Sequence, residues 1–199
     1  MARLPPLTRS ELDPDQLQLW DALTENRGGG VELVDEHGGL VGPFNSWLYV
    51  PKIGRRLSSL GAHLRFGTSI PRHLAEIAIC TVGAHWRSEF EFWAHAPMAI
   101  DHGVEPAVIE ALRSGADPVF DTDEERLVHQ VATQLLNDRR VDDATYAGTR
   151  TLLGEAGMVE LVALIGYYCL ISMLLNLFEV PLPAGEVPSW PDDTTTTAG

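Results

Sequence analysis

The stretch from Glu76 to His95 holds the densest group of side chains that could move protons. It reads EIAICTVGAHWRSEFEFWAH. Ser88, Glu91 and His95 fall on one side of a helix here, because each residue advances a helix by about 100°. Glu91 and His95 are four residues apart, so their side chains can touch. A carboxylate beside an imidazole can orient the ring and raise its pKa, which suits proton transfer near neutral pH.

The same spacing has simpler explanations. Ser88-x-x-Glu91 also fits a capping box, in which both side chains only satisfy the start of a helix. Glutamate and histidine four residues apart also occur on solvated helix faces without any chemical role. Glu76 lies on the preceding predicted helix, which could fold back across Gly83-Ala84 to face the pair.

A basic region leads into this stretch. Between His37 and Ser88 the only acid is Glu76, and the basic residues are Lys52, Arg55, Arg56, Arg65, Arg72 and Arg87. Such a region would attract a carboxylated substrate, which arginine can hold bidentately. We expect Arg72 or Arg87 to hold it, near Ser88; alternatively, these arginines pair with the acidic surface of this or another subunit. Tyr168 is a further candidate, as a phenol that could reach a pocket.

Composition excludes several classes of protein. The chain has 199 residues, 45% hydrophobic and 21% charged, which is typical of one globular domain. A net charge of −14 argues against a general nucleic-acid binder. The single lysine gives no polybasic membrane anchor, and the opening MARLPPLTRSELD lacks the apolar stretch of a secretory signal. We therefore expect a soluble, cytoplasmic protein.

No metal or phosphate motif is present. Cys80 and Cys169 give no disulfide framework, and the histidines lack the spacing of zinc ligands. Neither a GK[ST] phosphate loop nor a GxSxG nucleophile motif occurs. The sequence predicts no metal site.

Helix signals recur along the chain, and no convincing strand pattern interrupts them. We expect helices to begin at Pro14, Pro51, Pro71 and the capping box Thr122-x-x-Glu125. Gly28–Gly30 would end the first of these helices. The apolar face of the second is expected at Ile53, Leu57, Leu60 and Leu64.

A long apolar helix is predicted over residues 158–178, after another that ends near Gly154 or Gly157. Its core, Leu161–Leu175, has 15 residues without a charge, fewer than the roughly 20 that span a membrane. We expect it to be buried within its own domain or by a partner subunit, together with Leu17, Trp20 and Leu23 near the N-terminus.

These signals predict an all-α protein in three parts. Residues 1–42 would form an N-terminal helical extension and residues 43–180 the main helical domain. Residues 181–199 are rich in Pro, Gly, Asp and Thr and end in DDTTTTAG, so we expect a mobile tail or one lying across a neighbouring subunit.

The pattern Glu76, eleven residues, Ser88-x-x-Glu91-x-x-x-His95, with Gly103 beyond, resembles the carboxymuconolactone decarboxylase family and its alkylhydroperoxidase D-like branch. The upstream segment YVPKIGRRLSSLGAHLRFGTSIPRHLAEIAI is similar as well, and the resemblance covers roughly residues 43–180. It implies a single-domain helical bundle of the alkylhydroperoxidase D-like type. It also implies a homotrimer or homohexamer, a site near a subunit interface, and no metal or cofactor.

The resemblance also separates two kinds of chemistry. The family's peroxidase branch carries C-x-x-C-x-x-x-H, and here Ser88 and Glu91 stand at the two cysteine positions. Dithiol peroxidase chemistry is therefore not expected. The cysteine-free branch includes a decarboxylase of aromatic-acid catabolism, and it has a glutamate four residues before the histidine among aromatics, as in EFEFWAH here.

The resemblance thus implies a lyase (decarboxylase) or isomerase that acts by proton transfer on a small carboxylated lactone or a related conjugated acid. His95 would donate the proton, Glu91 would orient it, and Glu76 would serve as a second relay. The alternative is a non-catalytic ligand-binding or structural oligomer of the same fold. A peroxidase that uses Cys80 is a third hypothesis.

Overall fold

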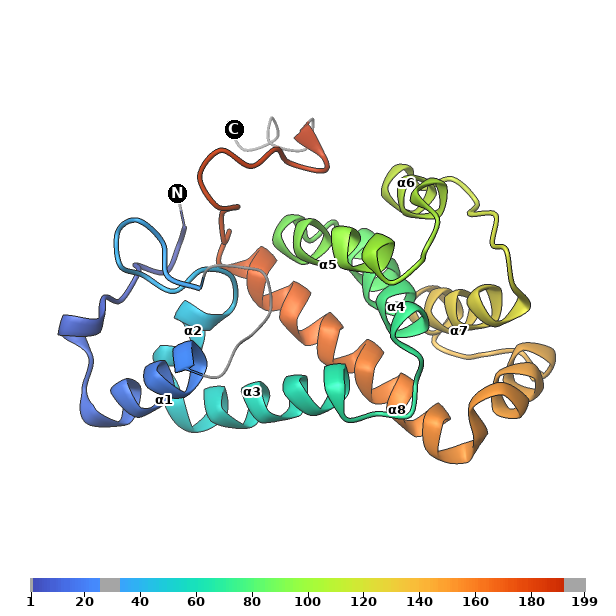
Figure 1. Cartoon of the computed structure of the whole chain (residues 1–199), viewed down its shortest axis with the longest axis horizontal. Coiled ribbons are helices and arrows are strands. Elements are labelled where there is room, and N and C mark those ends of the chain that lie inside the picture. The colour runs from blue at the N-terminus through green and yellow to red at the C-terminus, as the bar shows by residue number, and fades with distance from the viewer. Residues whose placement is uncertain (1, 26–32, 192–199) are drawn as a thin grey trace.

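The chain folds into an all-α domain, seen in a computed structural model that describes residues 2–25 and 33–191 (Figure 1). The described residues contain no strand beyond the isolated bridges Thr8–Gly39 and Val34–Leu40. The helices are a 3₁₀ turn at Arg9–Glu11, α1 (Pro14–Glu25), α2 (Phe44–Leu48), α3 (Pro51–Phe66), α4 (Arg72–His85), α5 (Glu89–Asp101), α6 (Pro106–Ser114), α7 (Asp123–Asp138) and α8 (Asp143–Leu177).

Local signals mark the first turns of several helices, including the predicted starts at Pro51 and at the box of Thr122 and Glu125. Pro51 and Pro106 stand in the first turns of α3 and α6, where a missing N–H costs nothing. The capping box of Thr122 and Glu125 begins α7. The Asp142 carboxylate accepts the first free N–H groups of α8. The predicted end of α1 at Gly28–Gly30 lies outside the described residues.

Helix α4 is the element around which α5, α6, α7 and α8 pack. Every residue from Leu74 to Gly83 is buried, and α4 contacts α5, α7 and α8. An α-helix that is buried on all sides must be apolar on all sides, so a polar residue within it needs partners inside the protein. Glu76 is such a residue, and it is wholly buried.

Helix α8 runs across the molecule between two groups of helices, α1–α3 and α4–α7 (Figure 1). It joins the two helices that the sequence predicts, with a kink at Gly154 (φ 67°, ψ 177°), a conformation that suits glycine. Within the described residues it is long and apolar enough to cross a membrane, by length and composition only, and 44% of its most apolar window is buried in the domain. One face of α8 is buried within the domain and packs on α4 and α7. Burial of the other face by a partner subunit, the alternative in the prediction, stays a prediction.

The buried face of α3 differs from the predicted one. Ile53 and Leu60 are 55% and 44% exposed, whereas Gly54 and Gly61 are buried beside Leu64. A Cβ at Gly54 would lie 2.7 Å from Leu19 and Trp47 side chains, and one at Gly61 would overlap the Tyr167 hydroxyl. Close approach of α3 to α1, α2 and α8 therefore selects the glycine face rather than the leucine face.

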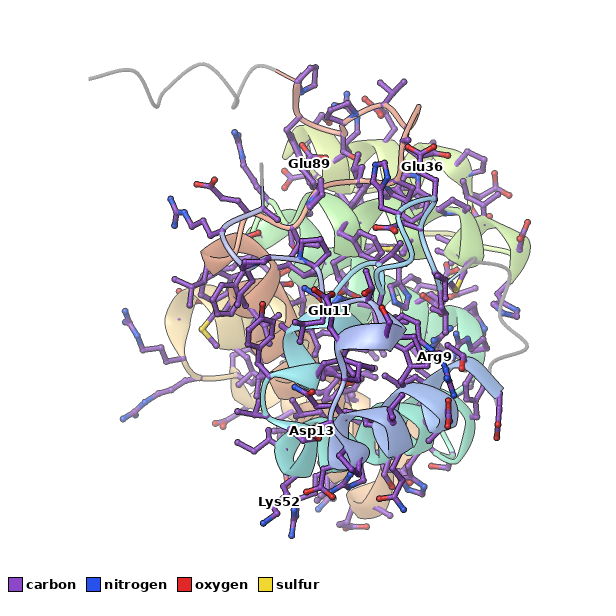
Figure 2. All side chains as sticks on the ribbon, turned by 90° about the vertical axis from the view of Figure 1, so that its left-hand side faces the viewer. Arg9, Glu11, Asp13, Glu36, Lys52 and Glu89 are labelled. Atoms are coloured by element: carbon purple, nitrogen blue, oxygen red, sulfur yellow. The ribbon has the colours of Figure 1, made fainter. Side chains whose placement is uncertain are left out.

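The N-terminal segment (residues 2–25 and 33–42) covers one side of the main bundle. Its helix α1 packs on α2 and α3 and buries Leu19, Trp20 and Leu23 within the same chain. Charged side chains of this segment and of α3, among them Arg9, Glu11 and Lys52, lie on the outer surface (Figure 2).

The segment after α8 is not free as far as the structure describes it. The Glu89 carboxylate of α5 accepts hydrogen bonds from the backbone N–H groups of Ser189 and Trp190 at 2.7 and 2.8 Å. Trp190 is buried and donates from Nε1 to the Arg113 carbonyl. Residues 181–191 thus pack on α5 and α6. The rest of the tail, predicted to be mobile or to lie across a neighbouring subunit, is residues 192–199, outside the described part.

Candidate functional site

A buried histidine between two carboxylates forms the centre of the site. His95 on α5 has its Nδ1 atom 2.7 Å from Glu76 Oε2 on α4 and its Nε2 atom 3.1 Å from Glu91 Oε1 on α5. The exposed fractions of Glu76, Glu91 and His95 are 0%, 4% and 5%. The chain turns back on itself between α4 and α5, with Arg87 at φ 44°, and this turn brings Glu76 to the pair predicted on α5.

The electrostatics of this group favour a charged imidazole. Burial alone would lower the pKa of His95, but the charge of Glu76 and the hydrogen bonds that the ring donates to Glu76 and Glu91 raise it to about 9. Burial likewise would raise the pKa of Glu76, yet the nearby charges of His95, Arg72 and Arg65 lower it. At neutral pH the arrangement therefore holds an imidazolium against the Glu76 carboxylate.

Two further side chains fix this group in place. Arg72 Nη2 lies 2.6 Å from Glu76 Oε1, a charge contact without the alignment of a hydrogen bond. Arg72 Nη1 also donates to the Arg65 carbonyl at 2.5 Å. The ring of Tyr168 on α8 packs edge-on against His95, with ring centres 5.1 Å apart, and burial raises the pKa of its phenol well above the ordinary value.

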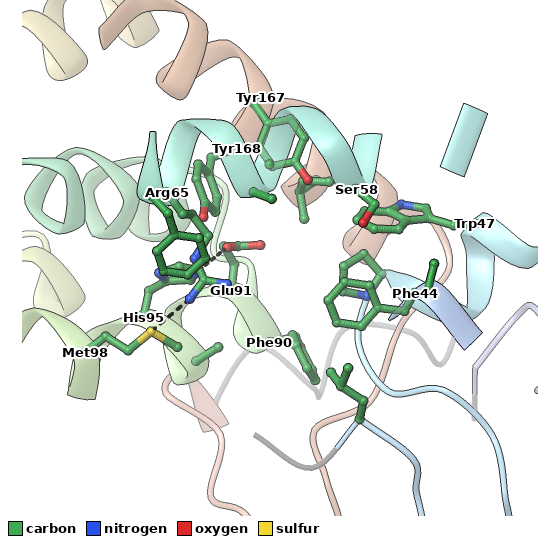
Figure 3. Close-up of a pocket in the computed structure, with 18 residues that line it drawn as sticks. Phe44, Trp47, Ser58, Arg65, Phe90, Glu91, His95, Met98, Tyr167 and Tyr168 are labelled. Atoms are coloured by element: carbon green, nitrogen blue, oxygen red, sulfur yellow. Dashed lines mark hydrogen bonds and ion pairs between the residues drawn. The ribbon is translucent and has the colours of Figure 1, made fainter. Parts of the chain in front are cut away.

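One side of the group opens on a cavity of about 260 Å³ (Figure 3). Glu91 and His95 lie at one end of it together with Arg65 and Tyr168, and Phe44 and Trp47 lie at the other. Most of the wall is apolar and comes from five helices, with contributions that include Phe44, Trp47, Phe90, Met98 and Ile171. Mostly apolar clefts with a few convergent polar groups are the usual form of small-molecule sites.

The predicted site residues divide into two groups. Glu91, His95 and Tyr168 line the cavity, and Glu76 lies directly behind His95. Arg72, Arg87 and Ser88, expected to bind substrate, are not among the described residues that line it. Arg72 is occupied by Glu76, and Arg87 is exposed in the turn before α5.

The capping-box alternative does not form. Ser88 begins α5, but its hydroxyl caps no N–H group and, though buried, has no hydrogen-bond partner. Glu91, the other half of that box, directs its carboxylate to His95 instead. The other simple explanation, a Glu91–His95 pair on a solvated helix face, is excluded as well, because both side chains are buried.

Sequence reasoning missed Arg65 and the N-terminal wall of the cavity. Ala22 and Leu33, from the N-terminal segment, line the cavity, so this segment closes it. On α3, the cavity-lining residues recur at helical spacing: Ser58, Gly61, Ala62 and Arg65. A run of small residues ending in arginine on one helix face is the signal that could have singled out Arg65.

Neither thiol chemistry nor a metal cluster stands out in the described part of the chain. Cys80 is wholly buried, and burial raises the pKa of its thiol well above the ordinary value, which disfavours the reactive thiolate. Cys80 and Cys169 are both unbridged. Residues 2–25 and 33–191 contain no group of three or more His, Cys, Asp or Glu arranged to hold a metal ion.

Solved structures resemble this fold. One is the alkylhydroperoxidase AhpD core, an uncharacterized peroxidase-related protein from Ralstonia eutropha JMP134, with 14% identity and a TM-score of 0.69 over 94% of this chain and 97% of that one. Another is an uncharacterized peroxidase-related protein from Silicibacter sp. TM1040, with 12% identity and a TM-score of 0.69 over 92% of each chain. No family model and no curated protein matches the sequence. The chain thus has an alkylhydroperoxidase D-like fold, which confirms the predicted fold class.

Proposed function

We propose that this protein is an enzyme that transfers protons to or from a small carboxylated lactone or a related conjugated acid, as a decarboxylase or an isomerase. The observation that supports this most strongly is a buried imidazole held by two carboxylates, one of which lines an apolar cavity. General acid–base catalysis needs such a group within reach of the ligand and with a pKa displaced toward its task.

The geometry favours Glu91 as the group that meets the substrate. Both ring nitrogens of His95 already face carboxylates, so a proton leaving Nε2 passes first to Glu91 Oε1. The sequence-based expectation had His95 as the donor and Glu91 as the group that orients it. In the revised roles, His95 stores the proton, Glu91 exchanges it with the ligand, and Glu76 with Arg72 holds the imidazole in place.

Each reaction balances with this set of groups. In a decarboxylation, the C–C bond to the carboxylate breaks and its electron pair moves into the conjugated carbonyl, which leaves a dienolate and CO₂. The dienolate carbon then takes a proton from Glu91. His95 gives Glu91 a new proton, and solvent protonates His95 again. In an isomerisation, Glu91 removes a proton from one carbon and returns it to another. The conjugated carbonyl of the substrate is the electron sink in both.

The proposal is tested by following CO₂ release and double-bond migration with γ-carboxymuconolactone. His95→Ala and Glu91→Gln should each lower kcat by about 10²-fold or more, the usual scale for a general acid or base. His102→Ala is the matched control, because His102 is an exposed histidine just after α5. Turnover by His95→Ala at the wild-type rate would refute the assignment.

A non-catalytic ligand-binding role is the second candidate. His95 is fully satisfied by Glu76 and Glu91 without any ligand, as a structural polar core would be. Ligand binding without turnover in the wild-type protein would favour this role.

A thiol peroxidase is the third candidate, because both similar structures are of peroxidase-related proteins. In the described part of this chain the thiols are those of Cys80 and Cys169, and burial raises the pKa of both. Peroxide consumption that disappears in Cys80→Ser would establish it.

A further inference from the structure

Arg65 is a cation at the cavity wall that lacks a carboxylate partner among the described residues. Its Nη2 atom lies 3.5 Å from the sulfur of Met98, a weak acceptor, and its guanidinium carbon lies 5.0 Å from the centre of the Phe66 ring. Its Nε atom is buried without a hydrogen-bond partner. These contacts position the side chain but do not neutralise its charge.

The other charges of the site are already matched. Arg72 faces Glu76, and the imidazole of His95 lies between Glu76 and Glu91. With His95 charged, two carboxylates face three cations, counting Arg65. Because an uncompensated charge at an apolar wall is unfavourable, the site has room for one more anionic group.

The cavity also restricts what carries that anion. Beyond Arg65 and Glu91, the space of about 260 Å³ extends between Phe44, Trp47 and Phe90, toward the far end shown in Figure 3. Aromatic walls of this kind suit a flat or ring-shaped apolar body. A small, freely hydrated anion would leave those walls in contact with water, so the shape favours an amphipathic ligand.

We propose that Arg65 binds the carboxylate of a small aryl or alicyclic acid, whose apolar ring lies between Phe44, Trp47 and Phe90 and whose carbon next to the carboxylate faces Glu91. This inference rests on the proposed function only for what happens to the ligand after it binds. A guanidinium stabilises the anion that it holds, so the carboxylate at Arg65 is one that the product retains. Where CO₂ is lost, it comes from a second carboxylate away from Arg65.

The test is calorimetric titration with 3-phenylpropanoate and its neutral isostere 3-phenylpropanamide. Wild-type protein should bind the acid about tenfold or more tightly than the amide, the scale of a hydrogen bond to a charged group. Arg65→Met should bind the two alike. Arg56→Met is the matched control, because it removes the same charge from an exposed position on the same helix, and it should retain the preference.

Arg65→Lys guards against a variant that fails to fold. It keeps the charge without the planar fork, and it should bind the acid with intermediate affinity. Equal binding of acid and amide by the wild-type protein overturns the proposal, as does an unchanged preference in a folded Arg65→Met. Glu91→Gln separates this proposal from the proposed function: it should still bind 3-phenylpropanoate more tightly than the amide but lose turnover of γ-carboxymuconolactone. If the wild-type protein binds carboxylates selectively but neither it nor any variant turns over γ-carboxymuconolactone, the Arg65 site is supported and the proposed enzymatic function is refuted.

Discussion

At the scale of single residues, the site is governed by the competition between burial and charge at His95. Burial disfavours the imidazolium, but two carboxylates at 2.7 and 3.1 Å outweigh it and raise the pKa to about 9. An ordinary histidine titrates near 6.5 and would be mostly neutral at pH 7.5. His95 therefore keeps its proton in reserve across the physiological range and can return it to Glu91.

The raised pKa has a definite consequence for stability. Because the pKa of His95 is higher in the folded state, protonation stabilises the fold fully below about pH 6.5, and this contribution is lost as the pH rises toward 9. Glu76 acts at the other end of the scale. Its pKa is lowered, so its contribution is present above about pH 4.5 and is lost as the pH falls below that.

At the scale of elements, the N-terminal segment and α5 meet at one glycine. Gly42 has φ 59°, and a Cβ there would lie 2.5 Å from the ring of Phe90, which lines the cavity. Gly42→Ala should therefore combine backbone strain with a steric clash at the cavity wall.

Gly38→Ala is the matched control for that substitution. Gly38 also has a positive φ, 78°, but a Cβ there would meet nothing within 4 Å. We expect Gly42→Ala to lose about 1–3 kcal/mol more unfolding free energy than Gly38→Ala, measured by urea denaturation. Equal losses in the two variants would mean that the N-terminal segment does not press on Phe90.

Elements were predicted where the signal is local, and missed where it depends on a neighbour. Pro51 and the box at Thr122 act within one turn of helix, so both helix starts follow from the sequence. The buried face of α3 depends on how closely Tyr167 of α8 approaches Gly61, and no periodicity within α3 encodes that distance.

The site, too, has features that local sequence predicts and features that depend on how the helices meet. The pairing of Glu91 with His95 follows from helical spacing and was predicted, with Glu76 opposite. Arg72 and Arg87 were preferred as substrate contacts on the basis of charge alone. Arg65 lies against the cavity only because α3 and α5 meet there, as its contact with Met98 shows.

At the scale of the whole molecule, α8 has an apolar face that residues 2–25 and 33–191 leave exposed. Val159, Val162, Leu170, Met173 and Leu177 are 71%, 52%, 38%, 46% and 59% exposed. Successive members are three, four or eight residues apart, spacings that keep all five on one side of a helix, so they form one stripe along it. A continuous apolar stripe of this kind is typical of an interface between subunits, and we propose that copies of this chain assemble through it. A homotrimer or homohexamer is the assembly that the family resemblance implies.

Light scattering coupled to gel filtration tests this expectation. Replacing Leu170 and Met173 together by Glu should release monomers, because like charges would face each other across the stripe. Val119→Glu is the control, since Val119 is 85% exposed outside the helices and away from the stripe. A wild-type protein that is monomeric at micromolar concentration would contradict the expected assembly.

The most direct measurement is an NMR titration of the His95 ring nitrogens, assigned by their loss in His95→Ala. It needs no substrate, and it examines the proton store on which the proposed chemistry depends. The predicted result is an imidazolium that persists through pH 8 with a pKa of about 9, and a lower pKa in Glu76→Gln, where the largest favourable charge is gone. A pKa at or below 6.5 in the wild-type protein would contradict the account, because His95 would then hold no proton to give at neutral pH.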